Sequence, residues 1–117
     1  MATWDENELD VSVGLEFSMD NKEFYVSILD TYLEETADEL AKMDEYVVTG
    51  DMPQYATLVH AIKSSSRIIG AGPLGERAYD LELKSKDGDI EYVKANHAAL
   101  KEHIAKVFDC INAYKAE

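Results

Sequence analysis

The sequence predicts an all-α fold, an up-down antiparallel four-helix bundle with a short additional helix at its N-terminal end. Apolar residues recur at helical spacing over long stretches, and no segment alternates apolar and polar residues for the length of a strand. Both prolines and most glycines lie at the ends of these stretches. The connections are roughly three to five residues long, which makes successive helices antiparallel neighbours.

The first long helix is expected after a short helix around Val11 to Phe17. Asp20-Asn21-Lys22-Glu23 has the N-cap residue and the N3 carboxylate of a capping box, which marks a helix start. The helix should end near Gly50. Its apolar residues are Phe24, Ile28, Leu29, Tyr32, Leu33, Leu40, Met43 and Val47.

The second long helix begins at Asp51-Met52-Pro53-Gln54. Asp51 can cap it, and Pro53 lies in the first turn, where a missing backbone N–H costs nothing. The segment Gly70-Ala71-Gly72-Pro73 ends it. One side of this helix is apolar and should face the bundle, through Tyr55, Leu58, Val59, Ile62 and Ile69.

Two further helices complete the predicted bundle. The third runs from about Leu74 to Lys86 and ends at Gly88. Asp87 or Asp89 can cap the last helix. The expected apolar residues are Ala78, Leu81 and Leu83 in the third helix, and Ile90, Val93, Leu100, Ile104, Val107 and Ile111 in the last.

The composition limits the classes of function. A chain of 117 residues fits one domain, residues 1–117, and we expect residues 1–6 to be poorly ordered. A net charge of −13 would repel nucleic acid. Cys110 is the only cysteine, so no disulfide forms within the chain. Neither a secretory signal nor an apolar run of transmembrane length is recognisable, so we expect a cytoplasmic protein without direct membrane contact.

The segment most informative about function is His60-Ala61-Ile62-Lys63-Ser64-Ser65-Ser66-Arg67. Residues three and four apart are neighbours on a helix, so Lys63 and Ser64 flank His60, and Arg67 follows almost two turns later. His60, Ser64 and Arg67 fall opposite the apolar side of this helix. The histidine is therefore predicted to face water.

This arrangement suits a histidine that receives a phosphoryl group. A neutral imidazole nitrogen is a competent nucleophile towards phosphorus, and an ordinary histidine is largely neutral at pH 7. Phosphoryl transfer chiefly needs positioning and charge stabilisation, which the ammonium group of Lys63 can supply. Ser64 is small enough to let another protein approach the ring. The basic residues between positions 60 and 86 give that segment a net charge of +2, whereas the rest of the chain carries −15.

The remaining reactive residues favour structural roles. His97 falls on the apolar side of the last helix and is expected to be buried and hydrogen-bonded, with His103 at the edge of that side. No cysteine or carboxylate completes a zinc site with them. Cys110 falls off the apolar side and is interpreted as structural. Ser65 and Ser66 point towards the core, and no Ser-His-Asp triad can be built along one helix.

An exposed His-x-x-Lys-small segment on the second of four long helices, followed by a glycine-rich turn, resembles the histidine-containing phosphotransfer (Hpt) domains of bacterial and plant phosphorelays. The resemblance covers most of the chain, from Asp10-Val11-Ser12-Val13-Gly14-Leu15 through His60 and Gly70 to Leu81-Glu82. It implies a stoichiometric phosphoryl carrier. His60 would accept a phosphoryl group from the phospho-aspartate of one receiver domain and pass it to another.

The same resemblance implies the partners and the remaining site residues. Receiver domains of response regulators, and a hybrid sensor histidine kinase, would be the partners of a monomer. Arg67, Glu82 and Lys86 would contact the receiver. At the position of Glu82, several members have a glutamine that orients the histidine ring, and at Ser64 a glycine is common. No cofactor is implied for this chain, because the magnesium ion belongs to the receiver.

A helical docking module without phosphotransfer is the alternative from another class. Ser64 in place of glycine, and a carboxylate near the ring at Glu82, keep this alternative open, because a carboxylate repels phosphate as readily as it accepts a hydrogen bond from imidazole. The sequence has no Walker loop or glycine-rich nucleotide motif, so we expect no ATPase activity. No other set of acid and base residues suggests an enzyme that acts on a small molecule.

Overall fold

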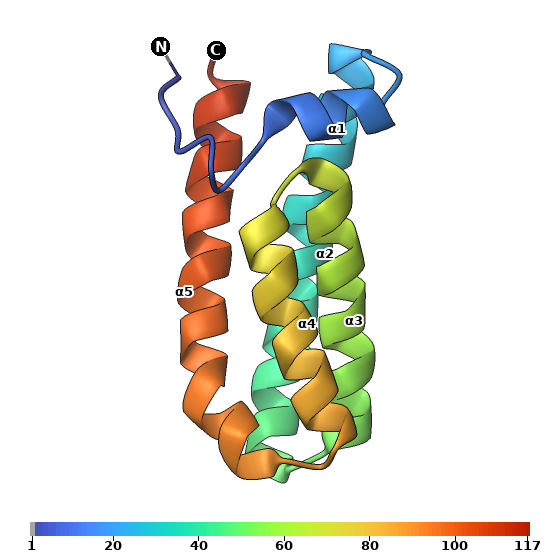
Figure 1. Ribbon diagram of the computed structural model, residues 1–117, viewed down its shortest axis with the longest axis vertical. Helices are drawn as coiled ribbons and strands as arrows, with labels where there is room; N and C mark the ends of the chain where they lie inside the picture. The colour runs from blue at the N-terminus through green and yellow to red at the C-terminus, as the bar shows by residue number, and fades with distance from the viewer. Residues whose placement is uncertain (1) are drawn as a thin grey trace.

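The computed structural model describes residues 2–117, and helices are the only regular elements in that range. Figure 1 shows their order along the chain. There are five helices, α1 (Val11–Phe17), α2 (Lys22–Thr49), α3 (Met52–Ile69), α4 (Gly72–Lys86) and α5 (Ile90–Lys115).

The four long helices α2 to α5 run alternately up and down and form an elongated bundle of 41 × 23 × 20 Å (Figure 1). The short helix α1 lies across the end of the bundle at which α5 finishes. The predicted four-helix bundle with an additional N-terminal helix is therefore confirmed. None of the helices in residues 2–117 is long and apolar enough to cross a membrane.

The helix ends follow the predicted signals, with two shifts. Asp51 and Asp89 cap α3 and α5 by accepting hydrogen bonds from backbone N–H groups. The cap of α2 is Asn21, so Glu23 lies at the second helical position instead of the third position of a capping box. α4 begins two residues before the expected Leu74, because Pro73 fits its first turn and its fixed φ is already helical.

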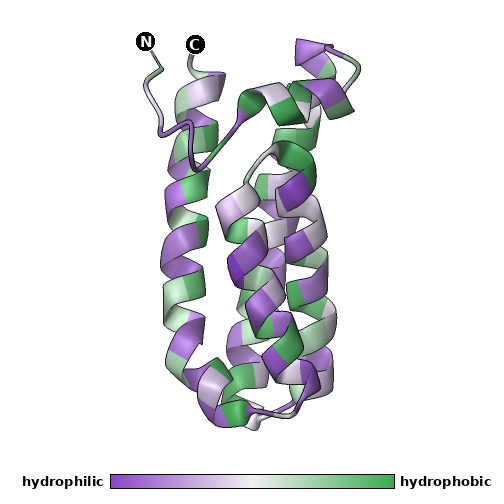
Figure 2. Ribbon diagram, in the orientation of Figure 1, coloured by the Kyte–Doolittle hydropathy of each residue, from purple (hydrophilic) through white to green (hydrophobic). Residues whose placement is uncertain are grey.

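The core lies between the four long helices, and hydrophobic and hydrophilic residues alternate around each of them (Figure 2). Three predictions about it are wrong. Phe24 and Leu83 are each 46% exposed, because they lie on the outer sides of α2 and α4. Cys110 is buried and belongs to the apolar core. The completely buried core residues include Leu29, Met43, Tyr55, Val59, Ile62, Val93, Leu100, Val107 and Ile111.

The N-terminal segment contacts the end of α5. The Trp4 ring packs edge-on against Tyr114, with 5.4 Å between ring centroids. The Trp4 Nε1–H group donates to the carbonyl oxygen of Leu9 at 3.1 Å. The sequence predicts poor order for residues 1–6, of which residue 1 lies outside the described part of the chain. Within the described residues, Trp4 makes the two contacts given above.

α1 is fastened to the turn between α3 and α4. The backbone N–H of Asp10 donates to the carbonyl oxygen of Gly70 at 2.9 Å. The Tyr25 hydroxyl donates to the carbonyl oxygen of Ile69 at 2.8 Å, and Gly14 lies against the Tyr25 ring. These contacts fix the end of α3 and thereby the direction in which α4 returns alongside it.

Candidate functional site

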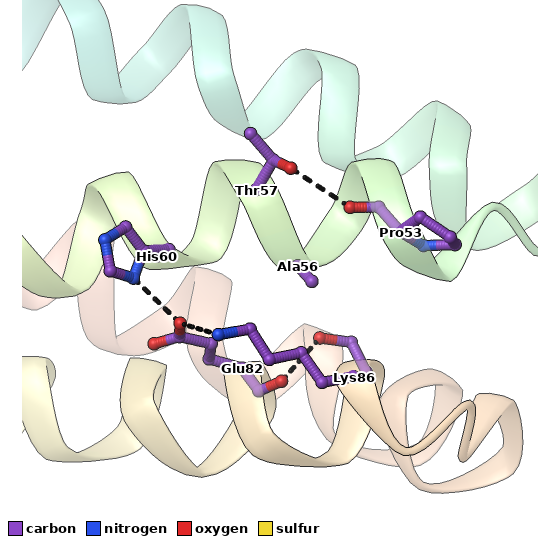
Figure 3. Close-up of a pocket in the computed structure, with 7 residues that line it drawn as sticks. Pro53, Ala56, Thr57, His60, Glu82 and Lys86 are labelled. Atoms are coloured by element: carbon purple, nitrogen blue, oxygen red, sulfur yellow. Dashed lines mark hydrogen bonds and ion pairs between the residues drawn. The ribbon is translucent and has the colours of Figure 1, made fainter.

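The candidate site lies on the outer side of α3, where α4 runs antiparallel to it (Figure 3). His60 is in the middle of α3, and its side chain is 56% exposed. Its Nδ1 atom lies 2.8 Å from Oε2 of Glu82 on α4. The predicted exposure of His60 is confirmed, and the short turn at Gly70 brings Glu82 beside the ring as the sequence suggested.

Glu82 is a buried carboxylate surrounded by cations. Only 2% of the residue is exposed. Lys63 Nζ lies 2.7 Å from its Oε1 atom, and Lys86 Nζ lies 2.8 Å from its Oε2 atom. Burial by itself would raise the pKa of Glu82, but hydrogen bonds from Lys63, Lys86 and His60 outweigh it and lower the pKa to about 2. The carboxylate is therefore ionised at neutral pH.

An ionised carboxylate determines which nitrogen of His60 carries the proton. A carboxylate without a proton can only accept hydrogen bonds, so Nδ1 must donate to Oε2 of Glu82. In the neutral imidazole, the proton is then on Nδ1 and the lone pair is on Nε2. Among the described residues, Nε2 has no hydrogen-bond partner. Nε2, the nitrogen with the free lone pair, is thus the one that makes no hydrogen bond to α4.

The two lysines differ in how accessible they are. The Lys63 side chain is 13% exposed, and its ammonium group also lies 5.2 Å from the centroid of the Tyr79 ring. The Lys86 side chain is 60% exposed and reaches Glu82 from the solvent side. Lys63 is close to His60 as predicted, yet its ammonium group contacts the buried carboxylate. Lys86 is therefore the more accessible cation beside the ring.

The other predicted site residues, Arg67, Ser64 and Glu82, differ in their distance from the His60 ring and in their burial. Arg67 pairs with Glu76 at 3.2 Å and lies over the Tyr79 ring, so it does not join the cluster around Glu82. Ser64 is half-buried one turn after His60. Glu82, which is expected from the sequence to contact a receiver, is buried beneath His60 and Lys86.

A groove opens beside His60, with a volume of about 480 Å³. It runs towards the start of α3, and Figure 3 shows the side chains along it. Helical spacing places three groove residues on the His60 side of α3, a signal that sequence reasoning overlooked. The groove residues are Pro53, Ala56, Thr57, His60, Glu82, Ser85 and Lys86.

A comparison with protein families agrees with this geometry. The family model described as "Hpt domain" matches residues 27–109, which include α3 and α4 with the site. The chain belongs to the Hpt domain family. No solved structure shows significant similarity to it.

This Hpt domain also resembles a curated protein, the phosphorelay intermediate protein rdeA of Dictyostelium discoideum. The two are 23% identical over 108 residues, which make up 92% of this chain and 42% of that protein. The chain thus spans about two fifths of the length of this relative.

The other two histidines of the Hpt domain are held by neighbours through both ring nitrogens. His97 is 6% exposed and contacts Tyr55 at 3.0 Å and Asp44 at 2.8 Å, as predicted for a buried, hydrogen-bonded histidine. His103 contacts Arg77 and Glu8. Residues 2–117 contain no group of three histidine, cysteine or carboxylate side chains placed to hold a metal ion.

Proposed function

We propose that this Hpt domain is a stoichiometric phosphoryl carrier, in which His60 receives a phosphoryl group from the phospho-aspartate of one receiver domain and passes it to another. Membership of the Hpt family supports histidine phosphotransfer in a phosphorelay. A carrier needs an accessible nucleophile and no nucleotide site. The magnesium ion needed for aspartate chemistry would be held by the receiver.

The observation that carries the proposal is the state of the His60 ring. Nδ1 donates to the buried carboxylate of Glu82, and the exposed ring keeps its lone pair on Nε2. In the transfer, this lone pair forms a bond to phosphorus. The bond between phosphorus and the aspartate oxygen breaks, and its electron pair stays on the receiver's carboxylate. No proton has to leave the histidine, so no general base is required.

The neighbouring residues would assist in different ways. Lys86 is the exposed cation and would neutralise part of the charge on the incoming phosphoryl group. Lys63 would act indirectly, because its ammonium group contacts Glu82 and partly neutralises the negative charge next to the ring. Ser64 would leave room for the receiver, and Arg67 would contact it farther along α3. The open groove of about 480 Å³ beside His60 would give a partner segment access to the ring.

The first test replaces His60 and measures transfer. A phosphorylated receiver domain should label the parent protein with an acid-labile, base-stable phosphoryl group, because a phosphoramidate bond has that stability. His60→Gln should remain unlabelled, because the nucleophile is gone. His103→Gln is the matched control and should be labelled like the parent. Equal labelling of His60→Gln and the parent would contradict the proposal.

Docking without phosphotransfer is a second candidate, favoured by the negative charge that Glu82 places 2.8 Å from the ring. Small phosphoryl donors separate the two functions without any partner. After treatment with phosphoramidate, the carrier should gain the mass of one phosphoryl group in the parent and none in His60→Gln. An unchanged mass in the parent would favour docking alone.

A further inference from the structure

Glu82 places a full negative charge at a position where a neutral side chain could make the same hydrogen bond to Nδ1 of His60. A glutamine carbonyl oxygen can accept a hydrogen bond from Nδ1 as a carboxylate oxygen does. The carboxylate adds charge to that bond, and its burial is costly unless cations compensate. The structure supplies two such cations, Lys63 and Lys86, on the two oxygens. This arrangement calls for a role that depends on the charge itself.

We propose that Glu82 is a positioning residue that keeps the proton on Nδ1 after His60 has been phosphorylated, and that this makes phospho-His60 a stronger phosphoryl donor. The inference rests on the proposed function, because it concerns the phosphorylated state of the same ring. It assigns to Glu82 an effect on how readily the phosphoryl group leaves, besides the orientation of the ring.

The chemistry of the donating step explains the effect. When phospho-His60 gives up its phosphoryl group, the bond between phosphorus and Nε2 breaks and the electron pair stays on Nε2. A new bond forms between phosphorus and an oxygen of the receiver's aspartate. If Nδ1 has kept its proton, the ring leaves as neutral imidazole. If it has lost the proton, the ring must leave as an imidazolate anion, which is a far poorer leaving group.

Phosphorylation on Nε2 with a proton on Nδ1 gives the ring a positive charge, which Glu82 stabilises. The charged groups that face the ring within residues 2–117 are Glu82 and Lys86 from α4, with Lys63 of α3 behind Glu82. The carboxylate touches Nδ1 at 2.8 Å in a buried place, where screening by water is weak. An opposite charge in direct contact favours the charged form of a titrating group.

The lysines oppose a positive ring, but their positions limit this effect. Lys63 contacts the other oxygen of Glu82, Oε1. Lys86 is 60% exposed, so water screens its charge, and its flexible chain can turn towards the phosphoryl oxygens on the solvent side. The two lysines instead serve to keep Glu82 ionised in its buried position. The net effect of the cluster on Nδ1 is therefore set by the carboxylate.

The test compares Glu82→Gln with the parent after both have been phosphorylated with phosphoramidate. Nitrogen-15 NMR of the ring follows loss of the Nδ1 proton as the pH rises. In the parent, the midpoint of this titration should lie at least about one pH unit higher than in Glu82→Gln, the usual size of such a charge effect. At pH 8, transfer to an unphosphorylated receiver should be several-fold faster from the parent than from Glu82→Gln. At that pH, a larger fraction of the variant has lost the Nδ1 proton.

Lys86→Gln is the matched control, because it removes a cation from the same cluster and leaves the carboxylate in place. Its midpoint should be equal to that of the parent or higher, opposite to the shift in Glu82→Gln. A purely structural disturbance of the site would not shift the midpoints of the two variants in opposite directions. Equal midpoints in the parent and Glu82→Gln, or a downward shift in both variants, would overturn the inference. Failure to phosphorylate His60 in the parent would instead overturn the proposed function.

Discussion

At the scale of single residues, we expect the size of Ser64 to decide how closely a partner protein can approach His60. It lies one helical turn after the histidine on α3 and is half-buried. A larger side chain there would stand beside the imidazole, on the path of a receiver domain. A small phosphoryl donor needs far less space than a protein, so the two kinds of donor should respond differently to the size of this residue.

Ser64→Phe should therefore slow labelling by a phosphorylated receiver at least about tenfold, the effect of a barrier increase of roughly 1.4 kcal/mol. Labelling by phosphoramidate should change much less, because the ring itself stays exposed. Ser64→Ala is the control and should behave like the parent with both donors. Equal slowing with both donors would show that the phenylalanine disturbs the site instead of blocking the partner.

At the scale of helices, the turn between α3 and α4 sets the pairing of His60 with Glu82. Gly70 has a φ of 97°, and a Cβ atom there would lie 2.1 Å from the carbonyl oxygen of Asp10. Only glycine adopts this conformation readily and allows the segment before α1 to come so close. Gly72, two residues later, lies in the first turn of α4, and its Cβ position has no heavy atom within 4 Å.

The two glycines should respond in opposite ways to the same substitution. Gly70→Ala should lower the free energy of unfolding by about 1–3 kcal/mol, from backbone strain with a steric clash in addition. Gly72→Ala should leave it unchanged or raise it by up to about 1 kcal/mol, because alanine favours a helix. Urea unfolding followed by circular dichroism measures both. A neutral Gly70→Ala would contradict the close approach of Asp10.

The helices could be predicted from the sequence because caps, glycines and apolar spacing are local signals. The exposure of His60 followed from its place opposite the apolar side of α3. The depth of Glu82 did not, because the spacing of α4 alone does not reveal that three side chains from two helices converge on one carboxylate. Lys63 was predicted near the ring, but its contact with Glu82 depends on the distance between α3 and α4.

At the scale of the whole molecule, the chain carries a net charge of −13 and yet buries a carboxylate. The pKa of Glu82 is lowered to about 2 in the folded state, because hydrogen bonds from Lys63, Lys86 and His60 outweigh the cost of burial. A lowered pKa means that the folded protein binds fewer protons than the unfolded chain. Glu82 therefore contributes stability above its ordinary pKa of 4.5, and this contribution is lost as the pH falls towards about 2.

The free energy of unfolding should consequently fall more steeply between pH 5 and pH 3 in the parent than in Glu82→Gln, which has no proton to gain at this position. Urea unfolding at a series of pH values measures the difference. The other carboxylates are present in both proteins, so their effect cancels when the two pH dependences are subtracted. Parallel pH dependences for the two proteins would show that Glu82 is not held in its ionised form by the folded structure.

In the proposed transfer, Nε2 of His60 accepts the phosphoryl group because Glu82 holds the proton on Nδ1. Phosphorus–nitrogen correlation NMR of the phosphorylated protein, labelled with nitrogen-15 in its histidines, identifies the nitrogen that carries phosphorus. We expect a single phosphohistidine, with phosphorus bonded to Nε2 of His60. A phosphoryl group on Nδ1 of His60, or on His97 or His103, would contradict the account.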